Sequence, residues 1–161
     1  MVEMKVQGLF FDSETNQSIV VLKDEASGRT LPIWVGLFEA NAITMGIEHT
    51  WTPRPMTHDL LKNIIEGMNA QVRKIVINDL KSNTFYALLY LEVEGRSIEI
   101  DSRPSDAIAL ALRAKAPIFV AEKVLESASQ TEPKAAPKDL SDKWIDDLFD
   151  KLKPEDFKTE M

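Results

Sequence analysis

The sequence contains no cysteine among its 161 residues, which excludes a disulfide framework and a thiolate-bound metal site. It also lacks any apolar run near the roughly 20 residues that a membrane-spanning helix needs. The N-terminus, Met1 to Lys5, has neither the basic stretch nor the apolar core of a signal peptide. From these absences we expect a soluble, cytoplasmic protein with no membrane partner.

An excess of basic charge is missing as well. Net charge is −7, with 13 basic and 17 acidic residues in 1–126 and six basic and nine acidic residues in 127–161. A protein that grips nucleic acid tightly through its phosphates is expected to be basic. Stable nucleic-acid binding is therefore disfavoured, whereas transient binding of a nucleic-acid substrate remains open. Walker A, GxGxxG, HExxH and GxSxG motifs are absent.

The composition that is present, with 44% hydrophobic residues, suits one domain with a core and an appendage. We expect a domain over residues 1–126, a flexible linker rich in Ser, Ala and Pro over 127–139, and an acidic amphipathic tail helix over 140–161. The tail helix places an apolar stripe on one face: Trp144, Ile145, Leu148, Phe149 and Leu152. Its polar face is mainly Asp, so it is more typical of a docking element, in cis or at a dimer interface, than of a membrane helix.

Periodicity in the first 126 residues predicts an α+β fold with a mixed, largely antiparallel sheet packed with helices. Helical spacing covers 37–48, a stretch capped by Thr57, and a stretch from Pro104. The apolar run Phe85–Leu91 is expected to be a central strand. Expected strands are 3–12, 19–22, 31–35, 72–79, 85–92, 97–100 and 118–120, and Pro32 assigns 31–35 to an edge or a strand end.

Two segments 67 residues apart resemble each other. Residues 28–33 read Gly-Arg-Thr-Leu-Pro-Ile, and residues 95–100 read Gly-Arg-Ser-Ile-Glu-Ile. At the same offset Glu39 aligns with Asp106. Either the chain contains two hairpin–strand–helix units, or tight turns and buried helices have converged on similar residues. A repeat predicts equivalent first-turn positions for Glu39 and Asp106.

Polar residues concentrate in 101–107, between an alternating strand and an almost wholly apolar helix. One interpretation is structural: Pro104 suits the first helical position, Arg103 or Ser102 is the cap, and Asp106 is stabilised by the helix dipole by about 0.3–1 kcal/mol.

The chemical interpretation makes Asp101 and Asp106 oxygen ligands of Mg²⁺ or Mn²⁺, while Arg103 holds a phosphate bidentately. A helix N-terminus is positive and suits a phosphate better than a cation. Arg103 is thus the better-supported member of that set.

Two further segments supply candidates. In Thr57-His58-Asp59, His58 is a candidate general acid or base and Asp59 a second catalytic candidate, unless Thr57 merely caps a helix and His58 is exposed. Between Trp34 and Glu39, Trp34 suits the core better than base stacking. Glu39 gains interest as a third metal ligand mainly through its alignment with Asp106.

Four ordered segments resemble the signatures of the bifunctional nuclease domain family. They are Leu31–Ala40 (Leu-Pro-Ile-Trp-Val-Gly, then Glu-Ala), Arg54–Leu60 (Arg-Pro-Met-Thr-His-Asp-Leu), Asn83–Ala87 (Asn-Thr-Phe-Tyr-Ala) and Ile100–Leu110 (Ile-Asp-Ser-Arg-Pro-Ser-Asp-Ala-Ile-Ala-Leu). The resemblance covers about residues 3–126. It implies an α+β domain, a homodimer, and hydrolysis of DNA and RNA. Some members carry a C-terminal UVR motif, a helical pair of repair proteins, which residues 127–161 do not resemble.

Two functions follow as hypotheses. In the first, the protein is a metal-dependent nuclease in which carboxylate-bound Mg²⁺ or Mn²⁺ activates water and Arg103 steadies the developing charge. Its nominated catalytic residues are Asp101, Arg103, Asp106, His58 and Asp59. In the second, the protein is a non-catalytic binding or regulatory module whose polar cluster only caps a buried helix. Convergence of the carboxylates on one open cleft favours the nuclease, and separation at different helix ends favours the module.

Overall fold

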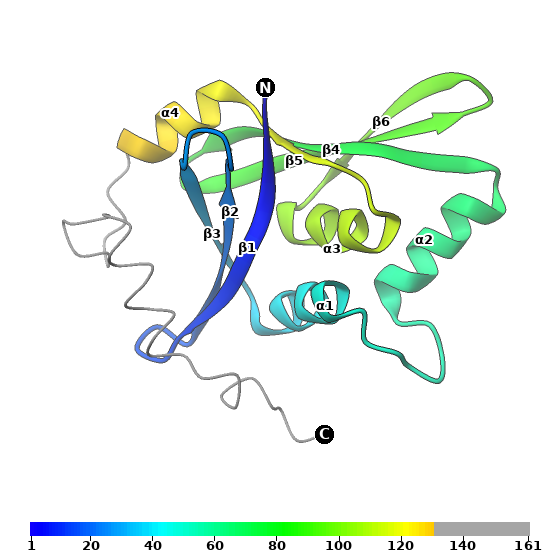
Figure 1. Ribbon diagram of the computed structural model, residues 1–161, viewed down its shortest axis with the longest axis horizontal. Coiled ribbons are helices and arrows are strands. Elements are labelled where there is room, and N and C mark those ends of the chain that lie inside the picture. Colours follow the sequence, from blue (N-terminus) through cyan, green and yellow to red (C-terminus); the bar gives the residue numbers. More distant parts are fainter. Residues whose placement is uncertain (131–161) are drawn as a thin grey trace.

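A computed structural model describes residues 1–130, and the expected tail helix over 140–161 lies outside this part of the chain. The described residues form seven strands and four helices (Figure 1). In chain order they are β1 Val2–Asp12, β2 Gln17–Lys23, β3 Thr30–Val35, α1 Leu37–Glu48, α2 Thr57–Gly67, β4 Ala70–Lys81, β5 Thr84–Val93, β6 Arg96–Ser102, α3 Pro104–Ala114, β7 Ile118–Val120 and α4 Glu122–Gln130.

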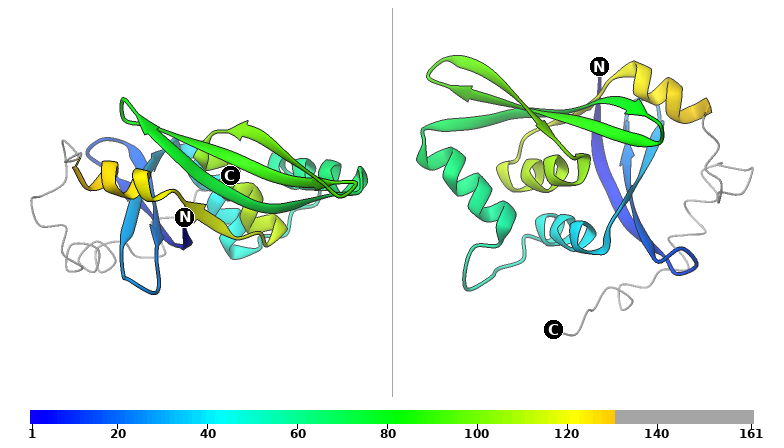
Figure 2. Two further views of the ribbon diagram at one scale, coloured as in Figure 1. Left: turned by 90° about the horizontal axis from the view of Figure 1, so that it is seen from above. Right: turned by 180° about the vertical axis from the view of Figure 1, so that it is seen from behind.

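The strands form one mixed sheet in the order β3-β2-β1-β7-β4-β5-β6. Every pairing is antiparallel except that of β7 with β4, which is parallel. The predicted α+β class with a largely antiparallel sheet is confirmed. Figures 1 and 2 show β1–β3 and β4–β6 on two different sides of α1 and α3, so the curved sheet borders these helices on both sides.

The sheet order reveals the two units that the 67-residue offset suggested. Strands β1-β2-β3 and β4-β5-β6 occupy mirrored positions on either side of the short strand β7, and each meander is followed by a helix. Gly28 and Gly95, at the start of the aligned segments, both have a positive φ, +78° and +76°. Glu39 and Asp106 both lie in the first turn of their helices. The segments at 28–43 and 95–110 are therefore structurally equivalent.

The main core lies between the sheet and α3. This helix buries most of its length, because its small alanines allow close approach on every side. Its neighbours are α1, α2, β4 and β5. In the strands of the core only alternate residues face it, as period-2 geometry requires.

Helices α1 and α3 approach each other closely at Gly46. A Cβ at this position would lie 3.0 Å from Nη1 of Arg113 and 3.2 Å from the Cβ of Leu112. The side chain of Arg113 is only 8% exposed. It forms hydrogen bonds with all three helices of the core. Its Nε donates to Asp59 of α2 at 2.9 Å, and its terminal nitrogens donate to the carbonyls of Ala109 in α3 and Ala42 in α1 at 2.9 and 3.0 Å.

Three expectations differ from the structure. Strand β5 is the second strand from one edge rather than a central one, and Tyr86 on its outer face is 39% exposed. Thr57 is the first residue of α2 instead of its cap, because the backbone N–H of Met56 donates to Asp59 and makes Met56 the cap. Helix α4, which was not expected, extends to Gln130, four residues into the segment predicted as linker.

No helix within residues 1–130 is both long and apolar enough to cross a membrane.

The contact at Gly46 predicts a difference between two glycine substitutions. Gly46→Leu should lower the free energy of unfolding by about 1–3 kcal/mol, because Arg113 and Leu112 leave no room for the new side chain. Gly67→Leu is the matched control, since nothing lies within 4 Å of a Cβ at Gly67. There, removing glycine from a helix should be neutral or stabilising by up to about 1 kcal/mol. Urea unfolding measures both, and equal effects of the two substitutions would contradict the packing argument.

Candidate active site

Helices α1 and α3 begin side by side, and the His58 side chain of α2 reaches them, so that Glu39, His58, Arg103 and Asp106 form a polar cluster. Glu39 lies in the first turn of α1, His58 is the second residue of α2, and Asp106 lies in the first turn of α3. Arg103 caps α3, as one of the two expected caps. The backbone groups at these three helix starts carry partial positive charge.

Asp106 is at the centre of the polar cluster. Its Oδ1 lies 2.9 Å from Nε2 of His58, and its Oδ2 accepts a 2.8 Å hydrogen bond from Nε of Arg103. Burial acts to raise the pKa of Asp106, but the hydrogen bonds from Arg103 and His58 outweigh burial and the pKa is lowered. Asp106 is therefore an acceptor near neutral pH, and the proton in its contact with His58 must be on Nε2.

Fixing the proton on Nε2 gives His58 a defined chemical capacity. In neutral imidazole the other ring nitrogen, Nδ1, then carries the lone pair. No residue in the described part of the chain makes a hydrogen bond to Nδ1, and the His58 side chain is 13% exposed. His58 thus combines a carboxylate that orients it with an available basic nitrogen, which is the arrangement that a general base needs.

Arg103 joins the two repeated units. It donates bidentately to Asp106 of its own unit and from Nη1 to Oε1 of Glu39 at 3.1 Å. The hydrogen bonds to Asp106 and then to Glu39 raise its pKa above the ordinary arginine value. These contacts use three of five N–H groups, and the side chain is 63% exposed, so the remaining N–H groups face solvent.

Glu39 reaches this position because residue 36 is glycine. A Cβ on Gly36 would lie within van der Waals overlap of the Glu39 carboxylate, so any other residue there would displace it. Gly36 caps α1 without a side-chain hydrogen bond, and its equivalent in the second unit, 67 positions later, is Arg103. In the first unit the cap leaves space that the Glu39 carboxylate fills, and in the second unit the cap residue supplies the guanidinium that binds this carboxylate.

The other two nominated residues are placed elsewhere. Asp59 belongs to a separate set of contacts, with the backbone N–H of Met56 and the side chain of Arg113. Burial tends to raise the pKa of Asp59, but these hydrogen bonds lower it. Asp101 pairs with Leu88, whereas its neighbours Ile100 and Ser102 pair with Leu89 and Ala87, which are buried beneath the helices. Asp101 therefore lies on the opposite face of the sheet from the polar cluster.

This placement bears on the expected divalent metal. The proposed ligand set was Asp101, Asp106 and Glu39, yet Asp101 is on the other face and the remaining two carboxylates are both paired with Arg103. Over residues 1–130 no three His, Asp or Glu side chains form a group that could hold a metal ion. The donor set in the described residues does not fit the expected Mg²⁺ or Mn²⁺ centre.

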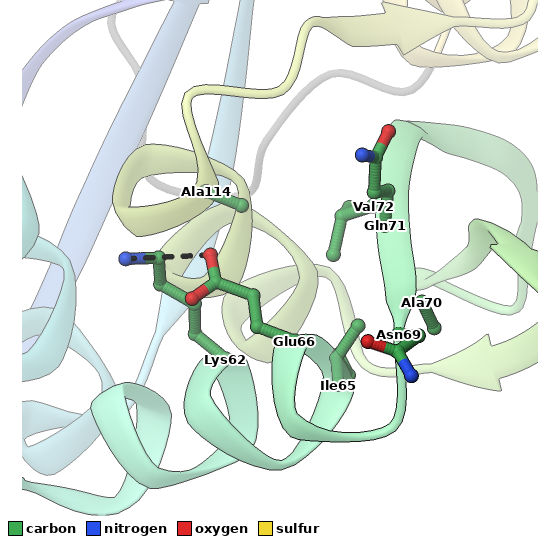
Figure 3. A pocket seen from close by; sticks show the side chains of 8 residues that line it. All are labelled: Lys62, Ile65, Glu66, Asn69, Ala70, Gln71, Val72 and Ala114. Atoms are coloured by element: carbon green, nitrogen blue, oxygen red, sulfur yellow. Dashed lines mark ion pairs between the residues drawn. The ribbon is translucent and has the colours of Figure 1, made fainter.

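Two hollows in the described surface lie away from the polar cluster. A shallow one of about 600 Å³ lies between α2, the start of β4 and the end of α3, where Lys62 and Glu66 point toward each other (Figure 3). A smaller one of about 210 Å³ is lined by Asp59, Lys62, Arg113 and His49 among others. Neither of these two hollows is lined by Glu39, His58, Arg103 or Asp106.

Two residues with decisive roles were not singled out from sequence. Gly36 was not predicted to have a role of its own. Its alignment with Arg103, 67 residues later, was the signal that the two residues occupy equivalent positions at the caps of α1 and α3. Arg113 follows a run of apolar helix residues, and a lone charge there was the available signal that it is buried and paired.

Comparison with known proteins gives consistent matches. The model of the bifunctional nuclease domain matches residues 20–133. An uncharacterised protein of Mycobacterium tuberculosis is 35% identical over 165 residues, which cover 98% of this chain and 99% of that protein. Bifunctional nuclease 1 of Oryza sativa subsp. japonica is 31% identical over 116 residues, or 70% of this chain and 35% of the rice protein. Bifunctional nuclease 1 of Arabidopsis thaliana is 29% identical over 112 residues, or 68% of this chain and 34% of that protein.

The ion pairs of Asp106 predict how acid affects stability. Because the folded pKa of Asp106 is below its ordinary value of 3.8, its contribution is complete above that value and is lost as the pH falls through the lowered folded pKa. The wild-type chain should therefore be more stable than Asp106→Asn at pH 6, with the difference shrinking toward pH 2. Urea midpoints across this range measure it. Asp101→Asn is the control. A difference in stability between wild type and Asp106→Asn that does not change with pH would contradict the lowered pKa of Asp106.

Proposed function

This chain belongs to the bifunctional nuclease domain family, and from that membership we propose that it hydrolyses phosphodiester bonds of DNA, RNA or both at the polar cluster. The family assignment confirms the resemblance found in the four sequence motifs. The observation that carries the proposal is the convergence of Glu39, His58, Arg103 and Asp106 beside the starts of α1 and α3. The matched plant relatives named as bifunctional nucleases support the same reaction class.

Binding of a phosphodiester is supported by two features of the polar cluster. The starts of α1 and α3, where Glu39 and Asp106 lie, contribute partial positive charge beside this site, which favours a phosphate. Arg103 is exposed and keeps N–H groups that are not used by Asp106 or Glu39. A planar guanidinium already oriented by two carboxylates can donate to a phosphate oxygen without losing its position.

His58 is the proposed general base. Its Nδ1 takes a proton from a water molecule as the water oxygen bonds to phosphorus. The bond from phosphorus to the leaving oxygen then breaks, and the leaving oxygen takes a proton from solvent. Asp106 keeps Nε2 protonated and stabilises the imidazolium, while Arg103 stabilises the negative charge that develops on the phosphoryl oxygens.

A requirement for Mg²⁺ or Mn²⁺ is a separate question for experiment. The described carboxylates do not supply the expected ligand set, so no step of the proposed mechanism is assigned to a metal. Assays in the presence of each ion and of a chelator therefore belong in the test.

The rival function is a non-catalytic binding or regulatory module. It is favoured by one observation, that both oxygens of Asp106 are paired within the fold and Arg103 is held by two carboxylates. In this case the polar cluster would stabilise the packing of the three helices and would have no catalytic role. The module and the nuclease differ in whether phosphodiester cleavage depends on His58.

We also propose that two copies of the chain associate through α2. Leu60 and Ile64 lie four residues apart on this helix, and Met68 follows at the same spacing as its C-cap; the three are between 50% and 69% exposed. An apolar stripe of this length on one helix can pack against the same stripe of a second copy around a two-fold axis. This agrees with the homodimer that the family resemblance implied.

Cleavage assays on DNA and RNA test the proposed chemistry. His58→Ala should reduce kcat by about 10²–10⁴, the usual contribution of a positioned acid or base. Arg103→Ala and Asp106→Asn should also reduce it, because one stabilises the transition state and the other orients His58. Asp101→Asn should leave cleavage unchanged, since Asp101 lies on the other face of the sheet.

Thermal melting of each variant separates lost chemistry from lost folding. Cleavage that is absent from the purified wild type with either metal and with chelator would reject the nuclease in favour of the module. Cleavage that survives in His58→Ala would reject His58 as the base.

Light scattering of the full chain tests association. The double variant Leu60→Lys/Ile64→Lys should convert a dimer into a monomer, because two charges would be buried without partners. Lys62→Glu, a charge change on the same helix beside the stripe, should leave the dimer intact. A wild-type monomer, or a dimer that survives the double variant, would contradict the α2 interface.

A further inference from the structure

An aromatic ring stands in solvent at the start of α1. The side chain of Phe38 is 86% exposed, the highest value among the large apolar side chains of residues 1–130, and that of its neighbour Leu37 is 58% exposed. Both residues lie in the first turn of α1, directly before Glu39 of the polar cluster. A ring in this position contributes little burial to the stability of the fold.

The repeated architecture shows that this part of the fold does not need an aromatic residue. At the 67-residue offset, Leu37 and Phe38 correspond to Pro104 and Ser105 in the first turn of α3. Pro104 and Ser105 are both buried, whereas Leu37 and Phe38 are both exposed. The first unit therefore presents a large apolar surface at a point where the second unit has a compact and covered one.

Phe38 lies at the same end of α1 as the guanidinium of Arg103. The next residue, Glu39, accepts a 3.1 Å hydrogen bond from Nη1 of Arg103, and its carboxylate folds back over Gly36 at the helix start. Consecutive Cα atoms are about 3.8 Å apart, and helical side chains tilt toward the N-terminus of their helix. Phe38 thus extends toward the start of α1, beside the exposed side chain of Arg103.

We propose that the ring of Phe38 is a stacking position for an unpaired nucleic-acid base, next to a phosphate held by Arg103. The inference rests on the proposed function, because it uses Arg103 as the phosphate contact. Every base has a π-face that can stack on an aromatic ring, so the position accepts any base. Bases inside a duplex are already stacked on their neighbours, and the position therefore selects single-stranded DNA or RNA.

The charge of the chain gives this contact its importance. With a net charge of −7, the protein gains little from a general attraction to phosphates. Arg103 is one cation, and two carboxylates already accept hydrogen bonds from it. A stacked base contributes to affinity without adding positive charge to the protein, and it holds the strand beside the polar cluster.

Binding of a short oligonucleotide tests the stacking position. The probe is a fluorescein-labelled single strand of mixed sequence, and its anisotropy is measured at low salt with the full chain carrying His58→Ala, so that cleavage does not consume it. Adding Phe38→Ala should weaken binding by about 5- to 150-fold, the usual effect of removing a stacking aromatic side chain. Adding Phe38→Trp should retain binding, because an indole ring also stacks on bases.

Trp51→Ala is the matched control for the loss of an exposed ring. The side chain of Trp51 is 82% exposed, but this residue follows the other end of α1, about 18 Å along the helix axis. Its removal should leave the affinity unchanged. Equal losses in Phe38→Ala and Trp51→Ala would overturn the proposal, and so would an unchanged affinity in Phe38→Ala.

An abasic probe separates the base from the phosphate. This strand keeps every phosphate but has no ring to stack, so its affinity should be the same with and without Phe38→Ala. A duplex of the original sequence should be equally insensitive to Phe38→Ala. An affinity for the abasic strand that depends on Phe38 would overturn stacking as the role of the ring.

Cleavage and association are measured separately from affinity. If Phe38→Ala alone changes neither affinity nor cleavage while His58→Ala abolishes cleavage, the stacking position is overturned and the nuclease is retained. If affinity depends on Phe38 in a chain that does not cleave, the stacking position is supported and the nuclease is rejected. Light scattering should give Phe38→Ala the same mass as wild type. A changed mass would assign Phe38 to a contact between copies and overturn the proposal.

Discussion

The arrangement of the three core helices depends on one buried guanidinium, that of Arg113. It contacts one group from each helix: the carbonyl of Ala42 in α1, the carboxylate of Asp59 in α2 and the carbonyl of Ala109 in α3. A buried cation without such partners would be strongly destabilising, so its contacts constrain where the helices can lie. Asp59 is adjacent to His58 in sequence, and the contact that satisfies Arg113 therefore also sets where α2 presents its histidine. The polar cluster at the surface depends on this buried contact beneath it.

The repeated architecture explains how two carboxylates come to share one arginine. Mirrored units around β7 bring equivalent first-turn acids, Glu39 and Asp106, to neighbouring helix starts. Two like charges so placed repel each other unless a cation lies between them. The units differ at the cap, where Gly36 leaves space and Arg103 supplies the cation. Two carboxylates that share one guanidinium thus arise from a repeated frame whose units differ at the cap.

Local sequence signals predicted the helices and strands better than they predicted how these elements are arranged in space. Alternation and helical spacing predicted ten of the eleven elements within residues 1–130, with the bounds of β7 exact and those of α1 close, because period and breaker residues act over a few positions. Helix α4 was missed since its polar composition resembles a linker. The site was predicted in part: Glu39, His58, Arg103 and Asp106 do meet, but Asp101 does not join them. Strand alternation decides that outcome, since one residue of difference in register moves a side chain to the other face.

Charge balance explains how the polar cluster can stabilise the packing of the helices and also offer a binding site. With neutral His58, the carboxylates of Glu39 and Asp106 exceed the single charge of Arg103 by one. The starts of α1 and α3 together supply about +1 of partial charge beside these groups, so the local balance is near neutral. Such a site is stable when empty, as the lowered pKa of Asp106 also indicates. It can also accept a phosphate, because Arg103 has unused N–H groups at its exposed side and need not leave its carboxylates to donate them. The N–H groups of Arg103 that pair with Asp106 and Glu39 contribute to stability, and its remaining N–H groups are available to an anion.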